Sequence, residues 1–166
     1  MRRLSLMRHA SAGTSDRAER SGEEDPPLTA DGITKARAAA RGLAELQIGV
    51  SLILTSPLSR AVQTAESVSQ VLAVPGDQIR RTESLTPGAV PSRLLEEIHA
   101  LEAAGILCVG HSPQSDDVIS HVLDCRSRMT AMKKAAVACM ELDSVSPPGG
   151  LLLWLHPQKA LRRLGK

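Results

Sequence analysis

The sequence predicts an α/β fold: a three-layer α/β/α sandwich whose mainly parallel sheet of about six strands carries helices on both faces. Short apolar runs alternate along the chain with segments whose apolar residues recur at helical spacing, an order typical of parallel sheets. The last two apolar runs are joined by a turn too short for a crossover helix, which predicts an antiparallel edge. Apolar residues make up 42% and charged residues 23% of the 166 residues, as in a folded domain.

The first strand is expected at residues 4–7. Residues 10–27 follow as a long polar loop, which is either a functional segment or a solvated connection. A helix is predicted next, because Thr29 can cap its first turn while Leu28 and Ile33 occupy the hydrophobic-staple positions. Apolar residues continue beyond them at helical spacing, so this helix is expected to be amphipathic.

The middle of the chain uses one pattern twice, in which an apolar strand runs directly into a Ser-Pro pair. Residues 51–55 and 105–110 are the two predicted strands, and Ser56 and Ser112 begin the pairs that follow them. Serine is favoured at the N-cap of a helix and proline at its first position. Each serine is therefore predicted to cap a helix.

The remaining elements complete a single domain. They are a short strand within residues 78–85, a helix that opens at Pro91, and two closing strands at residues 135–142 and 151–155 with a turn at 147–150. We expect one domain over residues 1–166, without a helical cap inserted between these elements.

The composition excludes several classes of function. The chain has no Phe, no Tyr and one Trp, so it lacks aromatic platforms for nucleic-acid bases and an aromatic cage for a quaternary cation. A net charge of +2 is too small to indicate a nucleic-acid partner. The longest apolar runs, about five residues, are too short to cross a bilayer, and Arg8 and His9 interrupt the first one. We therefore expect no membrane association and a cytoplasmic location.

The sequence also gives no sign of a metal or a nucleotide cofactor. Its three cysteines, Cys108, Cys125 and Cys139, are an odd number without a CxxC pair, which indicates core thiols. No HExxH motif or paired carboxylate cluster is present, and no glycine-rich phosphate loop of the GxxxxGK[ST] type. Neither a metal nor a cofactor is expected.

Side chains suited to phosphate follow three of the predicted strands. Arg8 and His9 follow the first strand, Arg60 lies one turn beyond the second, and His111 follows the strand at 105–110. Ligands of open α/β sheets bind outside the carboxyl ends of the strands, so these four residues are predicted to converge at one rim. Planar arginine forks and two helix N-termini would make that rim a binding site for a phosphoryl group.

An imidazole in such a site can act as a nucleophile and form a covalent phosphoryl intermediate. We expect His9 to attack phosphorus. Arg8, Arg60 and His111 are expected to neutralise the oxygens of the transferring group, because phosphoryl transfer is catalysed mainly by positioning and electrostatics.

Four motifs resemble those of the histidine phosphatase superfamily, also called phosphoglycerate-mutase-like. They are LMRHA at 6–10, PLTADG at 27–32, SPLSRAVQTA at 56–65 and VGHSP at 109–113. The short length and the segment ESLTP at 83–87 are similar to the phosphohistidine phosphatase SixA branch. The resemblance covers nearly the whole chain, with the motifs in the family's order.

This resemblance implies a role for each site residue. His9 would be the phosphorylated nucleophile, and Arg8 and Arg60 would bind phosphate. His111 would hold the phosphoryl group and stabilise its transition state. Family members commonly place an acidic proton donor near the middle of the chain, and Glu83 is the candidate here.

Two features depart from the family's pattern. Ala10 stands where the family's motif has Gly, which would strain the backbone only if this position required a positive φ. The alternative is that the position only requires a small side chain. Residues 11–27 contain no match to the further substrate contacts of the mutase-type members, which disfavours a sugar-phosphate mutase.

The expected function is a metal-independent phosphatase with a phosphohistidine intermediate that dephosphorylates phosphohistidine on a protein. Imidazole leaves readily when it is protonated on its far nitrogen, so this substrate depends little on a protein acid such as Glu83. One alternative is a phosphatase of a small phosphomonoester, a sugar or nucleotide phosphate. The other is a non-catalytic phosphate-binding module. The lack of aromatic side chains to sandwich a base disfavours a nucleotide.

Overall fold

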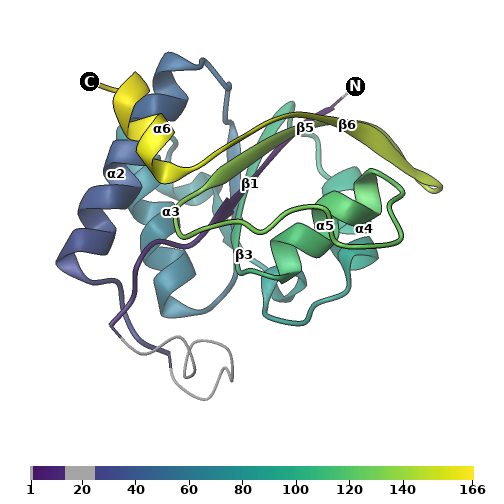
Figure 1. Cartoon of the computed structure of the whole chain (residues 1–166), viewed down its shortest axis with the longest axis horizontal. Coiled ribbons are helices and arrows are strands. Elements are labelled where there is room, and N and C mark those ends of the chain that lie inside the picture. Colours follow the sequence, from purple (N-terminus) through teal and green to yellow (C-terminus); the bar gives the residue numbers. More distant parts are fainter. Residues whose placement is uncertain (1, 14–24) are drawn as a thin grey trace.

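Six strands form one mixed sheet in the order β3-β2-β4-β1-β5-β6 (Figure 1), in a computed structural model that describes residues 2–13 and 25–166. The strands are β1 (Arg2–Arg8), β2 (Leu52–Thr55), β3 (Ile79–Arg81), β4 (Gly105–Gly110), β5 (Val137–Val145) and β6 (Pro148–His156). β1, β2, β3 and β4 run parallel, β5 is antiparallel to β1, and β6 is antiparallel to β5. The predicted fold class is therefore confirmed, including its antiparallel edge.

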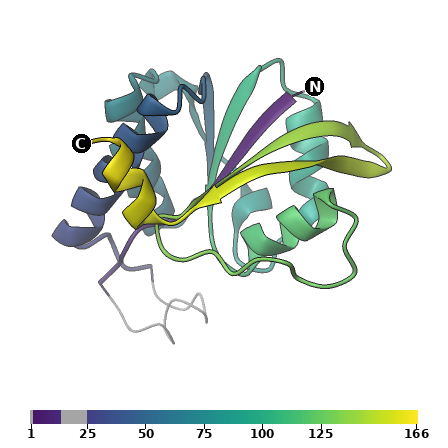
Figure 2. The same ribbon diagram turned by 45° about the horizontal axis from the view of Figure 1, so that its top comes forward.

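Helices cover both faces of this sheet. They are α2 (Ala30–Glu45), α3 (Ser59–Leu72), α4 (Pro91–His99), α5 (Gln114–Val122) and α6 (Gln158–Leu164), with short 3₁₀ turns η1 (Gly76–Gln78) and η2 (Glu83–Leu85). Figure 2 shows α2, α3 and α6 on one side of the sheet and α4 and α5 on the other. Among the described residues, no helix is long and apolar enough to span a bilayer.

The central strand β4 shows how the sheet separates two apolar cores. All of its residues are buried. Ile106 and Cys108 face the core under α4 and α5, whereas Leu107 and Val109 face the core under α2 and α3. Side chains alternate between the two faces of a strand, so a strand covered on both faces has a continuous apolar sequence.

Small residues explain how a chain without Phe or Tyr can fill these cores. The buried face of α2 is made mainly of Ala and Gly. α2 and α6 approach so closely at Gly42 that an added Cβ would lie 2.1 Å from the carbonyl oxygen of Leu161. Close approach of the backbones thus replaces large side chains as the means of close packing.

The start of α2 forms as predicted. Thr29 is its N-cap, and the Thr29 hydroxyl accepts a hydrogen bond from the Gly32 backbone N–H at 3.0 Å. Of the loop predicted at residues 10–27, residues 14–24 lie outside the described part of the chain. The described flanks meet in a bridge between Ala12 and Leu28.

The prediction that Ser56 and Ser112 cap helices is wrong. α3 begins at Ser59 and α5 at Gln114, and neither has a side-chain cap from the preceding serine. The Asp25 carboxylate accepts from the backbone N–H and the hydroxyl of Ser59, each at 2.7 Å. Asp25, from the loop between β1 and α2, therefore binds the N-terminus of α3, and the two serine hydroxyls have other partners, described below.

The end of the chain also differs from the prediction. The two closing strands are present, but β6 begins at Pro148, inside the predicted turn, and α6 follows it. Only one turn of α6 contacts the core, through Leu161. Its sequence, QKALRRL, therefore has little of the apolar periodicity by which a helix is predicted. The short strand predicted within 78–85 is β3, and η2 begins after it at Glu83.

We expect Gly42→Ala to lower the free energy of unfolding by about 1–2 kcal/mol, because the new methyl group forces α6 away from α2. Alanine is the better helix former by about 1 kcal/mol, so the measured loss understates the steric cost. Urea denaturation measures the change. The matched control is Gly76→Ala, where an added Cβ has no atom within 4 Å. A Gly42→Ala variant as stable as the control would contradict the close approach.

Candidate active site

The main chain aligns three strand ends at one rim of the sheet. Arg8 of β1 pairs with Gly110 of β4, and the His9 backbone N–H then donates to the Gly110 carbonyl at 2.9 Å. The Ser56 backbone N–H donates in the same way to Val109, at 3.0 Å. These bonds extend the parallel ladders past the strand ends, so the residues that follow β1, β2 and β4 lie side by side.

His9 and His111 meet at this rim. Their ring centroids are 5.1 Å apart, and the ring planes are tilted by 55°. Both residues are almost fully buried, with 2% and 3% of their surface exposed. The sequence prediction that these two histidines converge at the carboxyl ends of β1 and β4 thus agrees with the geometry.

Hydrogen bonding selects the tautomer of His9. Its Nδ1 lies 2.7 Å from the carbonyl oxygen of Ala10. A carbonyl oxygen only accepts, so Nδ1 carries the proton and Nε2 keeps its lone pair. Burial lowers the pKa of His9 to about 3, and the charges of Arg60, Arg8 and Lys134 act in the same direction. His9 is therefore a neutral imidazole at pH 7, with Nε2 available to a ligand.

His111 is held by the serine that had been expected to cap α3. Its Nε2 lies 2.9 Å from the Ser56 hydroxyl, which also accepts from the Leu58 backbone N–H at 3.3 Å. Burial lowers the pKa of His111 to about 2, with His9, Arg60 and Arg8 contributing in the same direction. This ring too is neutral at pH 7, and Ser56 fixes its orientation.

The two predicted arginines supply the positive charge of the site. Arg60 lies in the first turn of α3 and exposes none of its surface. Arg8 is half-buried, and its Nη1 donates to the Met132 carbonyl at 3.0 Å. The buried Arg8 Nε has no hydrogen-bond partner among the described residues, so this N–H can donate to an oxyanion.

Ala10 explains how the site tolerates a departure from the family's glycine. It is fully buried and is not among the residues with a positive φ. Its backbone N–H donates to the Thr64 hydroxyl at 3.1 Å, and that hydroxyl donates to the Arg60 carbonyl at 2.7 Å. The position therefore requires a small side chain close to α3, and alanine meets this requirement without backbone strain.

A cavity of about 940 Å³ opens beside the two histidines. Its described lining residues are Arg8, His9, Ser11, Lys35, Pro87, His111, Ser112, Pro113, Arg128, Lys133, Lys134, Pro157, Gln158 and Lys159. Within the described part of the chain, no cluster of His, Cys, Asp or Glu side chains is placed to hold a metal ion.

Glu83 lies near the rim but is not one of these lining residues. It is exposed and begins η2, which follows β3. Gln114, at the start of α5, donates from Nε2 to the Ser84 carbonyl at 3.2 Å, which fastens η2 beside the end of β4. The structure therefore brings Arg8, His9 and His111 to one cavity, with Arg60 buried beside them, and leaves Glu83 at the edge.

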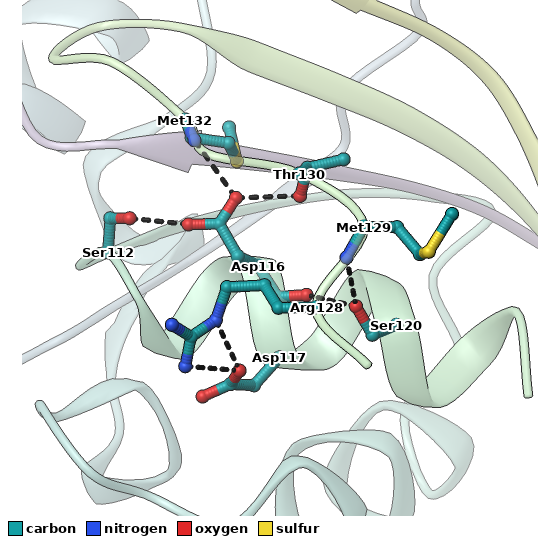
Figure 3. A network of polar contacts seen from close by, with 8 residues as sticks. All are labelled: Ser112, Asp116, Asp117, Ser120, Arg128, Met129, Thr130 and Met132. Atoms are coloured by element: carbon teal, nitrogen blue, oxygen red, sulfur yellow. Dashed lines mark hydrogen bonds and ion pairs between the residues drawn. The ribbon is translucent and has the colours of Figure 1, made fainter. Parts of the chain in front are cut away.

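Asp116 is the residue of this region that the sequence did not indicate. It is fully buried in the first turn of α5, and its carboxylate accepts from the hydroxyls of Ser112 and Thr130 and from the Met132 backbone N–H (Figure 3). The bonds to Thr130 and Met132 are 2.6 and 2.9 Å long. Since the Met132 carbonyl accepts from Arg8, this network links Asp116 to the position of Arg8. An acid in the first turn of a helix is common, so the sequence alone did not distinguish Asp116 from its neighbour Asp117.

Residues 4–103 match the family model of the histidine phosphatase superfamily, branch 1, which is more than half of the chain. The chain belongs to this superfamily. A curated relative, an uncharacterised protein of Picosynechococcus sp., is 37% identical over 113 residues. That match spans 66% of this chain and 66% of the relative, just under two thirds of its length.

Solved structures of the superfamily share the fold over nearly the whole chain. The protein histidine phosphatase SixA in complex with tungstate has a TM-score of 0.83 at 24% identity, covering 96% of this chain and 99% of that one. The mycobacterial glucosyl-3-phosphoglycerate phosphatase in complex with inorganic phosphate has a TM-score of 0.75 at 18% identity, covering 96% and 99%. The resemblance to the SixA-type branch is confirmed, and membership of the superfamily supports a phosphate-ester hydrolase.

The low pKa values of the two histidines predict that acid destabilises the fold. The unfolded chain, in which the pKa of histidine is about 6.5, binds more protons than the folded protein below that pH. The free energy of unfolding should therefore fall as the pH drops from 7 to 4, by up to about 1.4 kcal/mol per pH unit for each histidine.

Urea denaturation in phosphate-free buffer tests this pH dependence. His111→Gln, which cannot take up the proton, is expected to show a smaller slope than the unmodified protein. His99→Gln is the matched control, since His99 is exposed on α4. Equal slopes in the unmodified protein and in His111→Gln would contradict a neutral buried His111.

Proposed function

We propose that the protein is a metal-independent phosphatase that removes phosphate from phosphohistidine on a protein substrate through a phospho-His9 intermediate. The observation that carries the proposal is the bond from His9 Nδ1 to the Ala10 carbonyl, which leaves Nε2 as a buried, unprotonated nucleophile. Arg8 and Arg60 add positive charge next to it, and His111 lies opposite.

The first step is an in-line displacement at phosphorus. The lone pair of His9 Nε2 forms the new P–N bond while the bond from phosphorus to the leaving group breaks, and the leaving group takes the electron pair. Arg60 and the Nε of Arg8 bind the oxygens of the transferring group. His111 gains a favourable partner when the dianionic group arrives, which raises its pKa and allows it to donate to a phosphoryl oxygen.

The second step returns the enzyme to its starting state. Water attacks the phosphorus of phospho-His9, the P–N bond breaks, and inorganic phosphate leaves. The electron pair returns to Nε2, and the bond between Nδ1 and the Ala10 carbonyl holds the ring for the next attack. Electrostatic stabilisation by Arg8, Arg60 and His111 serves both steps, because each passes through a similar phosphoryl transition state.

The charge of the cavity supports phosphohistidine as the substrate. None of the described lining residues is a carboxylic acid, and Glu83 is exposed at the edge. An alkoxide leaving group needs an acid within hydrogen-bond reach. An imidazole that is already protonated on its far nitrogen does not. Glu83 stays the predicted proton donor for phosphomonoesters, since η2 lies at the same rim.

A small phosphomonoester is the second candidate substrate. The observation that favours it is the fold similarity to the mycobacterial glucosyl-3-phosphoglycerate phosphatase and to a phosphoserine phosphatase of Entamoeba histolytica. For either substrate we propose that residues 1–166 act as one domain without a helical cap, because a single sheet contains all the described strands. A cytoplasmic location stays a prediction.

His9→Ala is expected to lower kcat at least about 10³-fold, because the covalent route is lost. Quenching the unmodified enzyme during turnover of labelled phosphoramidate should trap a phosphoenzyme that is stable in alkali and lost in acid, as phosphohistidine is. His99→Ala, on the exposed side of α4, is the control and should keep both properties. A phosphoenzyme in His9→Ala would show that another residue is the nucleophile.

A substrate comparison separates the two candidate functions. We expect kcat/KM for a phosphohistidine peptide to exceed that for sugar phosphates. We also expect Glu83→Gln to lower kcat/KM about 10- to 100-fold for a phosphomonoester but less than about threefold for phosphohistidine. Faster hydrolysis of sugar phosphates would favour the second candidate, and equal effects on both substrates would remove Glu83 as the proton donor.

A further inference from the structure

The cavity beside the histidines has much more room than a phosphoryl group fills. Its volume of about 940 Å³ is in the upper range of pockets that enclose a drug-sized ligand, roughly 300–1,000 Å³. The group that reacts needs only the end formed by Arg8, His9 and His111. The rest of the cavity is therefore available to the part of the substrate that carries the phosphoryl group.

The walls of this cavity carry one sign of charge. Every charged residue among its described lining residues is a Lys or an Arg: Arg8, Lys35, Arg128, Lys133, Lys134 and Lys159. Two of these cations are paired with acids outside the lining, Lys35 with Asp31 at 2.7 Å and Arg128 with Asp117 at 2.8 Å. The set as a whole still focuses a positive potential into the cleft, which raises the local concentration of anionic ligands. The chemistry at His9 uses only part of this charge.

The lysines of the lining come from three parts of the chain. Lys35 lies on α2 and Lys159 in the first turn of α6, whereas Lys133 and Lys134 belong to the segment at residues 123–136 between α5 and β5. Figures 1 and 2 both show this segment leaving α5 and ending close to α6. A ligand in the cavity therefore meets lysines from three separate parts of the chain.

The wall formed by residues 123–136 is anchored at two points. The buried Asp116 carboxylate binds Thr130 and Met132, and the exposed Asp117 carboxylate accepts from Arg128 at 2.8 Å (Figure 3). Lys133 and Lys134 follow Met132 directly. The charge of Lys134 contributes to lowering the pKa of His9, which places it within electrostatic range of the nucleophile.

We propose that these lysines bind acidic side chains that flank the phosphorylated residue of a protein substrate. The proposal rests on the proposed phosphohistidine phosphatase function and adds the character of its partner, an acidic segment. Lys133 and Lys159 are exposed, as suits several mobile carboxylates. A fixed second phosphate would instead favour buried arginine forks.

Two phosphohistidine peptides of equal length test the proposal, one with Asp and Glu flanks and one with Ser flanks. At low salt the unmodified enzyme is expected to prefer the acidic peptide by about tenfold or more in kcat/KM, through KM, and to lose this preference as salt rises. In the double variant Lys133→Glu/Lys159→Glu the ratio of the two kcat/KM values should fall to about 1 or below.

Arg93→Glu/Lys166→Glu is the matched control, because it changes the net charge equally at exposed positions outside the cavity lining. It should keep the preference. Thermal unfolding verifies that both double variants are folded.

The failures of the two proposals are distinguishable. Equal kcat/KM for both peptides, unchanged in Lys133→Glu/Lys159→Glu, would overturn the acidic segment while leaving the phosphatase function in place. Turnover of small phosphoesters but of neither peptide would overturn the proposal that the substrate is a protein. A preference for a hexose bisphosphate over its monophosphate that the same double variant abolishes would assign the lysines to a small polyanion instead.

Discussion

The parallel register between β1 and β4 is the interaction on which the site depends. A histidine follows each of these strands. Because Arg8 pairs with Gly110, and the His9 N–H donates to the Gly110 carbonyl, the two histidines lie side by side. A shift of one residue would turn every side chain of one strand to the opposite face and separate the two rings. The packing of the two apolar cores opposes such a shift, since it would move Leu4 and Leu6 from the core under α4 and α5 to the core under α2 and α3.

Burial then gives these histidines their chemical character. Removed from water and placed near two arginines, both rings stay neutral, and hydrogen bonds to Ala10 and Ser56 orient them. Such an arrangement stabilises the protein less than an apolar site of the same size would, because buried charge costs free energy. In the proposed mechanism an incoming phosphoryl dianion offsets that cost. The lack of Phe and Tyr fits this chemistry, which needs charge and N–H donors and no aromatic faces.

The parts that could be predicted from the sequence are those that depend on local order along the chain. Strand β4 and the cap of α2 follow from apolar runs and from Thr29, and Arg8, His9 and His111 converge because each lies at or directly after the end of a strand.

The parts that could not be predicted depend on tertiary contacts. Ser56 and Ser112 have the sequence of N-caps, but His111 and Asp116 compete for their hydroxyls. The single apolar anchor of α6, Leu161, is meaningful only beside Gly42. The position of Glu83 at the edge of the site could not be read from its neighbours at all.

The proposed role of His9 is tested most directly by a crystal structure of the protein with vanadate bound. We expect vanadium at bonding distance from Nε2 of His9, with Nδ1 still donating to the Ala10 carbonyl. The vanadate oxygens are expected to contact Arg8, Arg60 and His111. Vanadate bound elsewhere in the cavity, or bonded to His111 instead of His9, would contradict the role of His9 as the nucleophile.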